Sequence, residues 1–185
     1  PESIAYQFAA TFTFRGDFEL AAMRGALADL VARHEILRTA FIQRGGEPVQ
    51  YVHPEVALPL EEVDLRGAGS DEVERLVQDR VRARLPVEEA PLIRWTLARV
   101  GEREWMLVQV EHHLIHDGWS FTVFTRELSE LYSARAEGRV AQLPEPELTF
   151  RDYALWEREL AGTAGFAEQL EHWKRALDPG AEPIE

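Results

Sequence analysis

The chain has 185 residues, of which 33 are acidic and 20 basic, so its formal net charge is −13. This excess of negative charge argues against a protein that binds nucleic acid or an anionic membrane surface, because both partners require clustered cations. The chain has no cysteine, which excludes disulfides, thiolate catalysis and cysteine-ligated zinc. Because the lack of cysteine fits a reducing compartment and no run of about 20 apolar residues is present, we expect a cytoplasmic protein.

Apolar periodicity predicts eleven elements in chain order. Alternation with period two predicts strands over residues 6–14, 37–43, 48–53, 58–64, 92–100 and 103–111. Helical spacing predicts helices over residues 20–34, 70–85, 119–138, 149–161 and 163–177. Asp17 and Ser70 are the expected caps of the first two helices. The order β-α-β-β-β-α-β-β-α-α-α predicts an α/β fold of the α+β two-layer kind, with helices packed against a mixed sheet.

The segment between the last predicted strand and the next helix is the most informative. Three of the six histidines lie between Glu111 and Ser120. Such loops often present catalytic groups, and an imidazole can act as a general base near neutral pH. Asp117 could orient the loop or an imidazole, and Gly118 allows a tight turn in a backbone conformation that other residues avoid. The following helix would direct the positive end of its dipole at this loop.

Several interpretations of this loop are open from the residues alone. The histidines could cap the strand and bond backbone groups. His113, His116 and Asp117 could bind a metal ion, although no second ligand cluster accompanies them. One histidine could instead act as a base in acyl transfer. The spacing from His112 to Asp117 is also that of glycerolipid acyltransferases, which are usually associated with membranes.

Three motifs carry a family resemblance. Residues 112–118 read His-His-x-x-x-Asp-Gly and resemble the signature of the condensation domains of nonribosomal peptide synthetases. Residues 33–41 resemble that family's Arg-His-Glu-x-Leu-Arg-Thr-x-Phe motif. Residues 150–156 resemble its Tyr-x-Asp-Tyr-Ala-x-Trp motif, with Phe in place of the first Tyr. The motifs follow the family's order and approximate spacing.

The resemblance implies a fold and a domain plan. Residues 1–178 look like the N-terminal lobe of a condensation domain, which is half of a chloramphenicol acetyltransferase-like pseudo-dimer. Residues 179–185 would begin the linker to a missing C-terminal lobe. We therefore expect the 185-residue chain alone to be inactive, because positioning two substrates is the main catalytic device of such a site. We also expect it to self-associate through exposed apolar surface.

The resemblance also implies a role for each site residue. His113 faces the reacting amine and thioester, as a base, as a positioning group or as a stabiliser of the tetrahedral intermediate, and His112 is its structural neighbour. Asp117 points away from the reaction centre and pairs with an arginine of the earlier motif, Arg33 in preference to Arg38. Gly118 leaves room for the substrate arm.

The implied activity is amide bond formation between a donor thioester and an acceptor amine. Both substrates would be carried on the phosphopantetheine arms of peptidyl or acyl carrier proteins, with no cofactor or metal bound directly. The retained His pair and the following Trp119-Ser120 favour a peptide-bond-forming member over heterocyclisation and epimerisation relatives. Two alternatives are a standalone acyltransferase that uses a carrier-bound acyl donor and a non-catalytic lobe that docks carrier proteins.

Overall fold

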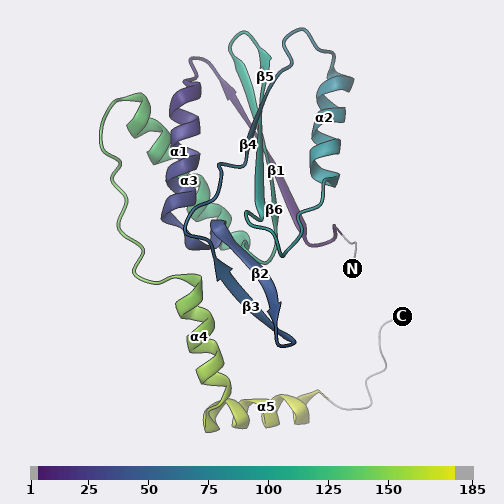
Figure 1. The fold of residues 1–185 in the computed structure, drawn as a ribbon, viewed down its shortest axis with the longest axis vertical. Helices are drawn as coiled ribbons and strands as arrows, with labels where there is room; N and C mark the ends of the chain where they lie inside the picture. The colour runs from purple at the N-terminus through teal and green to yellow at the C-terminus, as the bar shows by residue number, and fades with distance from the viewer. Residues whose placement is uncertain (1–3, 178–185) are drawn as a thin grey trace. The chain divides into compact units, whose positions relative to one another are not determined.

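The computed structural model describes residues 4–177, which form two compact units divided between Glu145 and Pro146. The first unit contains both sheets and the first three α-helices, and the second contains the last two (Figure 1). The predicted linker at residues 179–185 lies outside the described residues, so the domain boundary stays a prediction. None of the helices within residues 4–177 is long and apolar enough to cross a membrane.

Every predicted element is present with its predicted type. The strands are β1 (Gln7–Arg15), β2 (Thr39–Arg44), β3 (Glu47–Val52), β4 (Leu60–Asp64), β5 (Ile93–Gly101) and β6 (Glu104–His112). The helices are α1 (Leu20–Arg33), the short 3-10 helix η1 (Glu35–Arg38), α2 (Ser70–Arg82), α3 (Gly118–Ala136), α4 (Phe150–Ala161) and α5 (Ala164–Ala176). The predicted α/β class, a mixed sheet packed with helices, is confirmed.

Both expected helix caps are wrong. The residue that caps α1 is Glu19, and the residue that caps α2 is Gly69; neither makes a side-chain capping bond. Asp17 instead lies within ion-pair distance of Arg103, with 2.8 Å between Oδ1 and a guanidinium nitrogen. Ser70 is already the first residue of its helix.

The main sheet places β6 in its interior. The strand order is β1-β6-β5-β4, with β4 and β5 parallel and the other pairs antiparallel, while β2 and β3 form a separate hairpin. Because β6 has a neighbour on each side, its last residues are held from both directions. The His112 N–H donates to the Leu92 carbonyl at 2.9 Å, and the His113 N–H donates to the Tyr6 carbonyl at 2.7 Å. The loop that follows therefore starts from a rigid position.

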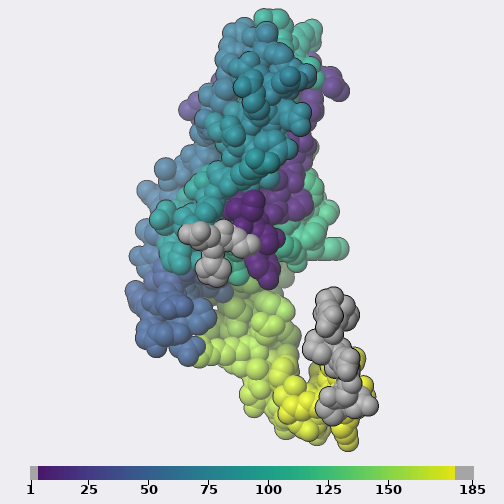
Figure 2. All heavy atoms as spheres, turned by 90° about the vertical axis from the view of Figure 1, so that its right-hand side faces the viewer, coloured from purple at the N-terminus to yellow at the C-terminus, as the bar shows by residue number. Residues whose placement is uncertain are grey.

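Helices cover both faces of this sheet. Helices α1 and α3 lie side by side on one face, and α2 lies on the other, where its side chains form the upper part of the surface seen in Figure 2. The core lies between the α1–α3 pair and the sheet, and fully buried members include Leu27, Leu30, Leu97 and Leu107. Burying each such side chain stabilises the fold by about 1.5–3 kcal/mol.

The second unit consists of α4 and α5. A capping box begins α4, because the Thr149 hydroxyl accepts from the Asp152 N–H and the Asp152 carboxylate accepts from the Thr149 N–H. On α4 the Tyr153 ring lies 6.2 Å from the Phe150 ring and 5.6 Å from the Trp156 ring. The aromatic residues of this motif therefore contact one another along one helix.

Candidate active site

The side chain of His113 is exposed at the end of the interior strand β6. Its Nδ1 lies 2.8 Å from the backbone carbonyl oxygen of His116, in the same loop. A carbonyl oxygen can only accept a hydrogen bond, so Nδ1 is the nitrogen that carries the proton. In the neutral imidazole this leaves the Nε2 lone pair available as a base.

His112 shapes the turn that carries His113. Its Nδ1 accepts a hydrogen bond from the Leu114 N–H at 3.1 Å, and its carbonyl accepts from the Ile115 N–H at 3.0 Å. Partial burial, followed by the nearby charge of His113, lowers the pKa of His112. A neutral Nδ1 acceptor is the form that this turn requires, which fits the structural role that the motif implies.

The expected ion pair between Asp117 and an arginine of the earlier motif is wrong. Asp117 is an exposed N-cap of α3, and its Oδ1 accepts from the Ser120 N–H at 2.7 Å and from the Ser120 hydroxyl at 2.6 Å. Arg33 instead donates to Glu127 at 3.1 Å, and Arg38 donates to the His53 carbonyl at 2.6 Å. The hydrogen bonds from Ser120 lower the pKa of Asp117.

Replacing Asp117 with alanine is expected to lower the free energy of unfolding by about 1 kcal/mol, which is the usual cost of losing an N-cap. The predicted cost is small because the carboxylate is exposed and leaves no buried cation behind. Asp117→Ser, which restores a capping oxygen, is expected to recover most of the loss. Urea unfolding of the 185-residue chain at neutral pH measures both variants. A loss above about 3 kcal/mol would indicate a buried ionic partner instead.

Gly118 does not adopt a conformation that requires glycine. It is the first residue of α3, its φ lies outside the left-handed region, and a Cβ built on it meets no atom within 4 Å. The expected tight turn is therefore wrong. The open space beside Gly118 leaves the second expectation, room for a substrate arm, as a prediction.

A buried polar network beneath the loop was not predicted. The Trp95 Nε1–H donates to Gln109 Oε1 at 2.8 Å, and Gln109 Nε2 donates to Glu111 Oε1 at 2.9 Å. The same Glu111 oxygen lies 3.0 Å from Nδ1 of His116. The signal in the sequence was the alternation of polar Gln109 and Glu111 on the strand face that also carries apolar Trp105.

Burial shifts the titration of this pair. Desolvation raises the pKa of Glu111 to about 7, against the smaller effects of its Gln109 hydrogen bond and the charge of His113. Desolvation, followed by the charge of His113, lowers the pKa of His116, and the charge of Asp117 opposes this. Both shifts favour the uncharged forms, as expected for side chains in a low-dielectric interior.

The raised pKa of Glu111 makes stability depend on pH. A carboxyl whose pKa rises from 4.5 to about 7 on folding contributes stability below pH 4.5 that is lost as the pH rises through 7. Glu111→Gln has no such titration. We therefore expect the free energy of unfolding of the wild type, relative to this variant, to fall by about 2–3 kcal/mol over that range and then level off. Urea titrations at several pH values measure this difference, and a constant difference from pH 5 to 8 would contradict it.

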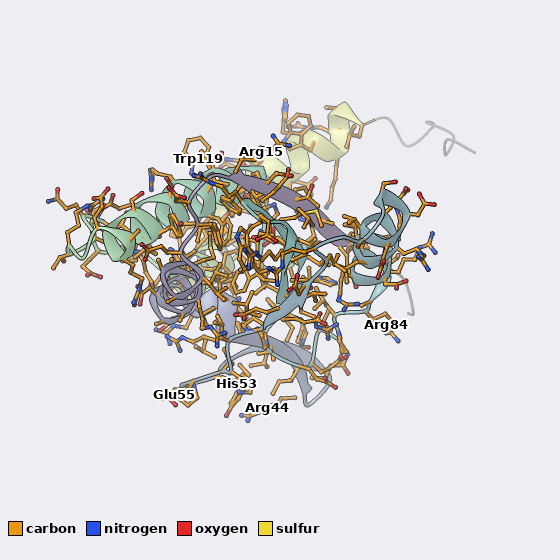
Figure 3. The ribbon with its side chains drawn as sticks, turned by 90° about the horizontal axis from the view of Figure 1, so that it is seen from above. Arg15, Arg44, His53, Glu55, Arg84 and Trp119 are labelled. Atoms are coloured by element: carbon orange, nitrogen blue, oxygen red, sulfur yellow. The ribbon has the colours of Figure 1, made fainter. Side chains whose placement is uncertain are left out.

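A cavity of about 180 Å³ lies beside this network. Its polar lining includes His34, Glu111 and His116, and its apolar lining includes Leu30 and Phe124. Trp119, which is 80% exposed, also borders it and projects outward at the start of α3 (Figure 3). The loop thus combines an exposed imidazole with a neighbouring hollow. Within residues 4–177 no group of three or more His, Cys, Asp or Glu side chains is placed to hold a metal ion.

Comparison with known protein families shows to which family the chain belongs. A family model described as the condensation domain matches residues 1–184. The chain belongs to the condensation-domain family. One of the linear gramicidin synthase proteins of Brevibacillus parabrevis is 37% identical over 100% of this chain and 4% of its own length. Surfactin synthase subunit 2 of Bacillus subtilis is 34% identical over 95% of this chain and 5% of its own length. The chain therefore spans a small fraction of the synthetases that it matches.

Solved structures confirm the fold of this family member. SgcC5 from Streptomyces globisporus is 34% identical, with a TM-score of 0.81 over 97% of this chain and 41% of that one. The X-domain from teicoplanin biosynthesis, solved in complex with OxyB, is 27% identical, with a TM-score of 0.89 over 100% of this chain and 41% of that one. The condensation-domain chain thus matches less than half of each of these two solved chains.

Proposed function

We propose that this chain is the N-terminal lobe of a condensation domain that forms an amide between a donor acyl thioester and an acceptor amine. The relatives named as gramicidin and surfactin synthases support the reaction class. The observation that carries the assignment is His113, which lies exposed at the end of β6 with Nδ1 bonded to a carbonyl and Nε2 free. This is the geometry of a general base.

The reaction balances without a covalent enzyme intermediate. The acceptor nitrogen attacks the thioester carbon, so a C–N bond forms and the C–S bond breaks. His113 Nε2 takes the proton that the nitrogen loses and passes it to the departing thiolate. In this proposal both substrates arrive on the phosphopantetheine arms of carrier proteins, and this lobe binds no cofactor of its own. A cytoplasmic location belongs to the same proposal and is supported by the lack of cysteine.

A C-terminal lobe completes the site in this proposal. Its support is that the chain covers only 41–45% of the condensation-domain structures that it matches. Exposed apolar residues such as Trp119 and Leu114 are then the surface on which the 185-residue chain would self-associate.

The test uses the complete condensation domain with donor and acceptor thioesters loaded on their carrier proteins, and mass spectrometry detects the amide. The complete domain is expected to form product and the 185-residue chain to form none. Carrier-protein binding without product in both proteins would favour the non-catalytic docking lobe. Normal turnover by the 185-residue chain would contradict the need for a second lobe.

A second candidate is transfer of a carrier-bound acyl group to a free alcohol or amine. The observation that favours it is the SgcC5 structure, which holds a naphthyl-substituted ethanediol and is 34% identical to this chain. Offering a free aryl diol in place of the acceptor carrier protein separates the two functions. Ester formation would support the second candidate, and strict dependence on a loaded acceptor carrier protein would support the first.

A further inference from the structure

The donors and acceptors in the network under the His loop can be assigned from the indole of Trp95. Indole Nε1–H of Trp95 can only donate, so it fixes Gln109 with its oxygen toward the indole and its amide nitrogen toward Glu111. Oε1 of Glu111 must then act as an acceptor. That oxygen also lies 3.0 Å from His116 Nδ1, so the imidazole of His116 faces the carboxyl group within ion-pair distance. The side chains of Gln109, Glu111 and His116 are all buried, so each of these contacts is shielded from water.

Packing holds the His116 ring in this orientation. Its ring stacks on Phe8 of β1 at a centroid distance of 4.8 Å and an interplanar angle of 18°. Phe121 of α3 meets the same ring edge-on at 5.9 Å. His116 is thus fixed by groups from β1, β6 and α3, although it lies in a loop.

His116 also provides the hydrogen-bond acceptor for His113. Its backbone carbonyl accepts from Nδ1 of His113 at 2.8 Å, while Nδ1 of its side chain lies 3.0 Å from Glu111 Oε1. One residue therefore links a buried carboxyl to the exposed imidazole. Without Glu111, the buried His116 Nδ1 would lose the polar group that it faces at 3.0 Å, and an unsatisfied buried polar nitrogen favours displacement of the ring and its carbonyl.

We propose that Glu111 and His116 are positioning residues for His113. The buried pair holds the His116 carbonyl in place, and that carbonyl keeps His113 in the Nδ1–H tautomer with Nε2 directed to the substrate. The catalytic consequence rests on the proposed function, whereas the control of the tautomer does not. The His-His-x-x-x-Asp-Gly motif leaves position 116 variable and does not include position 111, so this pair is an addition to it.

The test reads the tautomer directly. Two-bond ¹H–¹⁵N correlation spectra of the 185-residue chain, recorded at about pH 8.5 where imidazoles are neutral, distinguish the Nδ1–H and Nε2–H forms of His113. The wild type is expected to show Nδ1–H. Glu111→Leu is expected to shift His113 toward Nε2–H, and Glu111→Gln, which keeps an acceptor oxygen, is expected to retain Nδ1–H. Glu104→Leu is the matched control, because Glu104 lies at the opposite end of β6 and pairs with Arg15 on the surface.

Turnover in the complete domain gives the second readout. Glu111→Leu is expected to lower kcat by roughly 10- to 100-fold with KM for the carrier substrates unchanged, since a misplaced base affects the transition state. Glu111→Gln is expected to stay close to wild type. If Glu111→Leu does not fold, His116→Phe keeps the ring on Phe8 and removes Nδ1, and the same shift of the His113 tautomer is expected.

The outcomes separate the two proposals. An unchanged Nδ1–H form of His113 in folded Glu111→Leu or His116→Phe would overturn the positioning role. A shifted tautomer in a complete domain that forms no amide, even as wild type, would support the positioning role and contradict the proposed function.

Discussion

Replacing His113 with alanine in the complete condensation domain is expected to lower the rate of amide formation by about 10²- to 10⁴-fold, the usual contribution of a general base. Its exposed ring makes one hydrogen bond to the protein, through Nδ1, so little of the fold depends on it. We expect the free energy of unfolding to fall by about 1 kcal/mol or less. The measurement is single-turnover amide formation from carrier-bound thioesters, with urea unfolding in parallel.

His53→Ala is the matched control for this variant. His53 also belongs to the first unit, where its ring contacts Tyr51 at 4.7 Å, and it lies on the side of that unit opposite Trp119 (Figure 3). Its loss is expected to leave turnover unchanged. Turnover of the His113 variant within threefold of wild type would remove the base from the mechanism. Such a result would mean that the rate enhancement of amide formation comes from positioning the two thioesters.

The fold was predictable wherever a local pattern determines it. The alternation along β5 and β6 and the apolar stripe of α3 predicted both strands, the helix and the loop between them. The sequence had no comparable signal for the parallel pairing of β4 with β5, because pairing between distant strands depends on tertiary packing. It also could not reveal that the chain from Glu35 to Arg38 tightens into a 3-10 turn before β2 begins.

The site was predictable in its motif residues but not in their partners. The motif pointed to the loop that carries His113, whose catalytic role stays a prediction, and it suggested an arginine for Asp117. A local signal favoured the observed cap, since an Asp three residues before Ser120 at a helix start can accept that residue's backbone N–H. The pairing of Glu111 with His116 depends instead on how far the loop folds back, which spacing alone does not determine.

The arginine of the first motif has a structural partner that the sequence did not show. Arg33, at the end of α1, donates to Glu127 of α3 at 3.1 Å, and His34 Nε2 lies 2.6 Å from the same carboxylate oxygen. The Glu127 side chain is 5% exposed and that of Arg33 is 14% exposed. Glu127 lies on the apolar stripe of α3. Arg33, the first residue of the motif, therefore pairs with a carboxylate that is buried against the core. This pair joins the two helices that cover the sheet beneath the His loop.

Arg33→Met is therefore expected to lower the free energy of unfolding by about 3 kcal/mol, because it leaves Glu127 buried with His34 as its main remaining partner. Arg33→Met combined with Glu127→Met is expected to recover most of that loss, since two packed apolar side chains replace a buried ion pair at little cost. The measurement is the midpoint of urea unfolding of the 185-residue chain. The dependence of the free energy of unfolding on urea concentration should be the same in all variants, so that a shifted midpoint reports stability.

The pair between Arg15 and Glu104 provides the contrast, because it joins the ends of β1 and β6 in solvent. Arg15→Met is expected to cost less than about 1 kcal/mol, as exposed ion pairs usually do. A double variant as unstable as Arg33→Met alone would show that the arginine acts through its other contacts, with the Pro144 carbonyl and Glu145, rather than through the buried carboxylate. The comparison therefore decides whether the first motif stabilises the site by pairing α1 with α3 or by fixing the chain that follows α3.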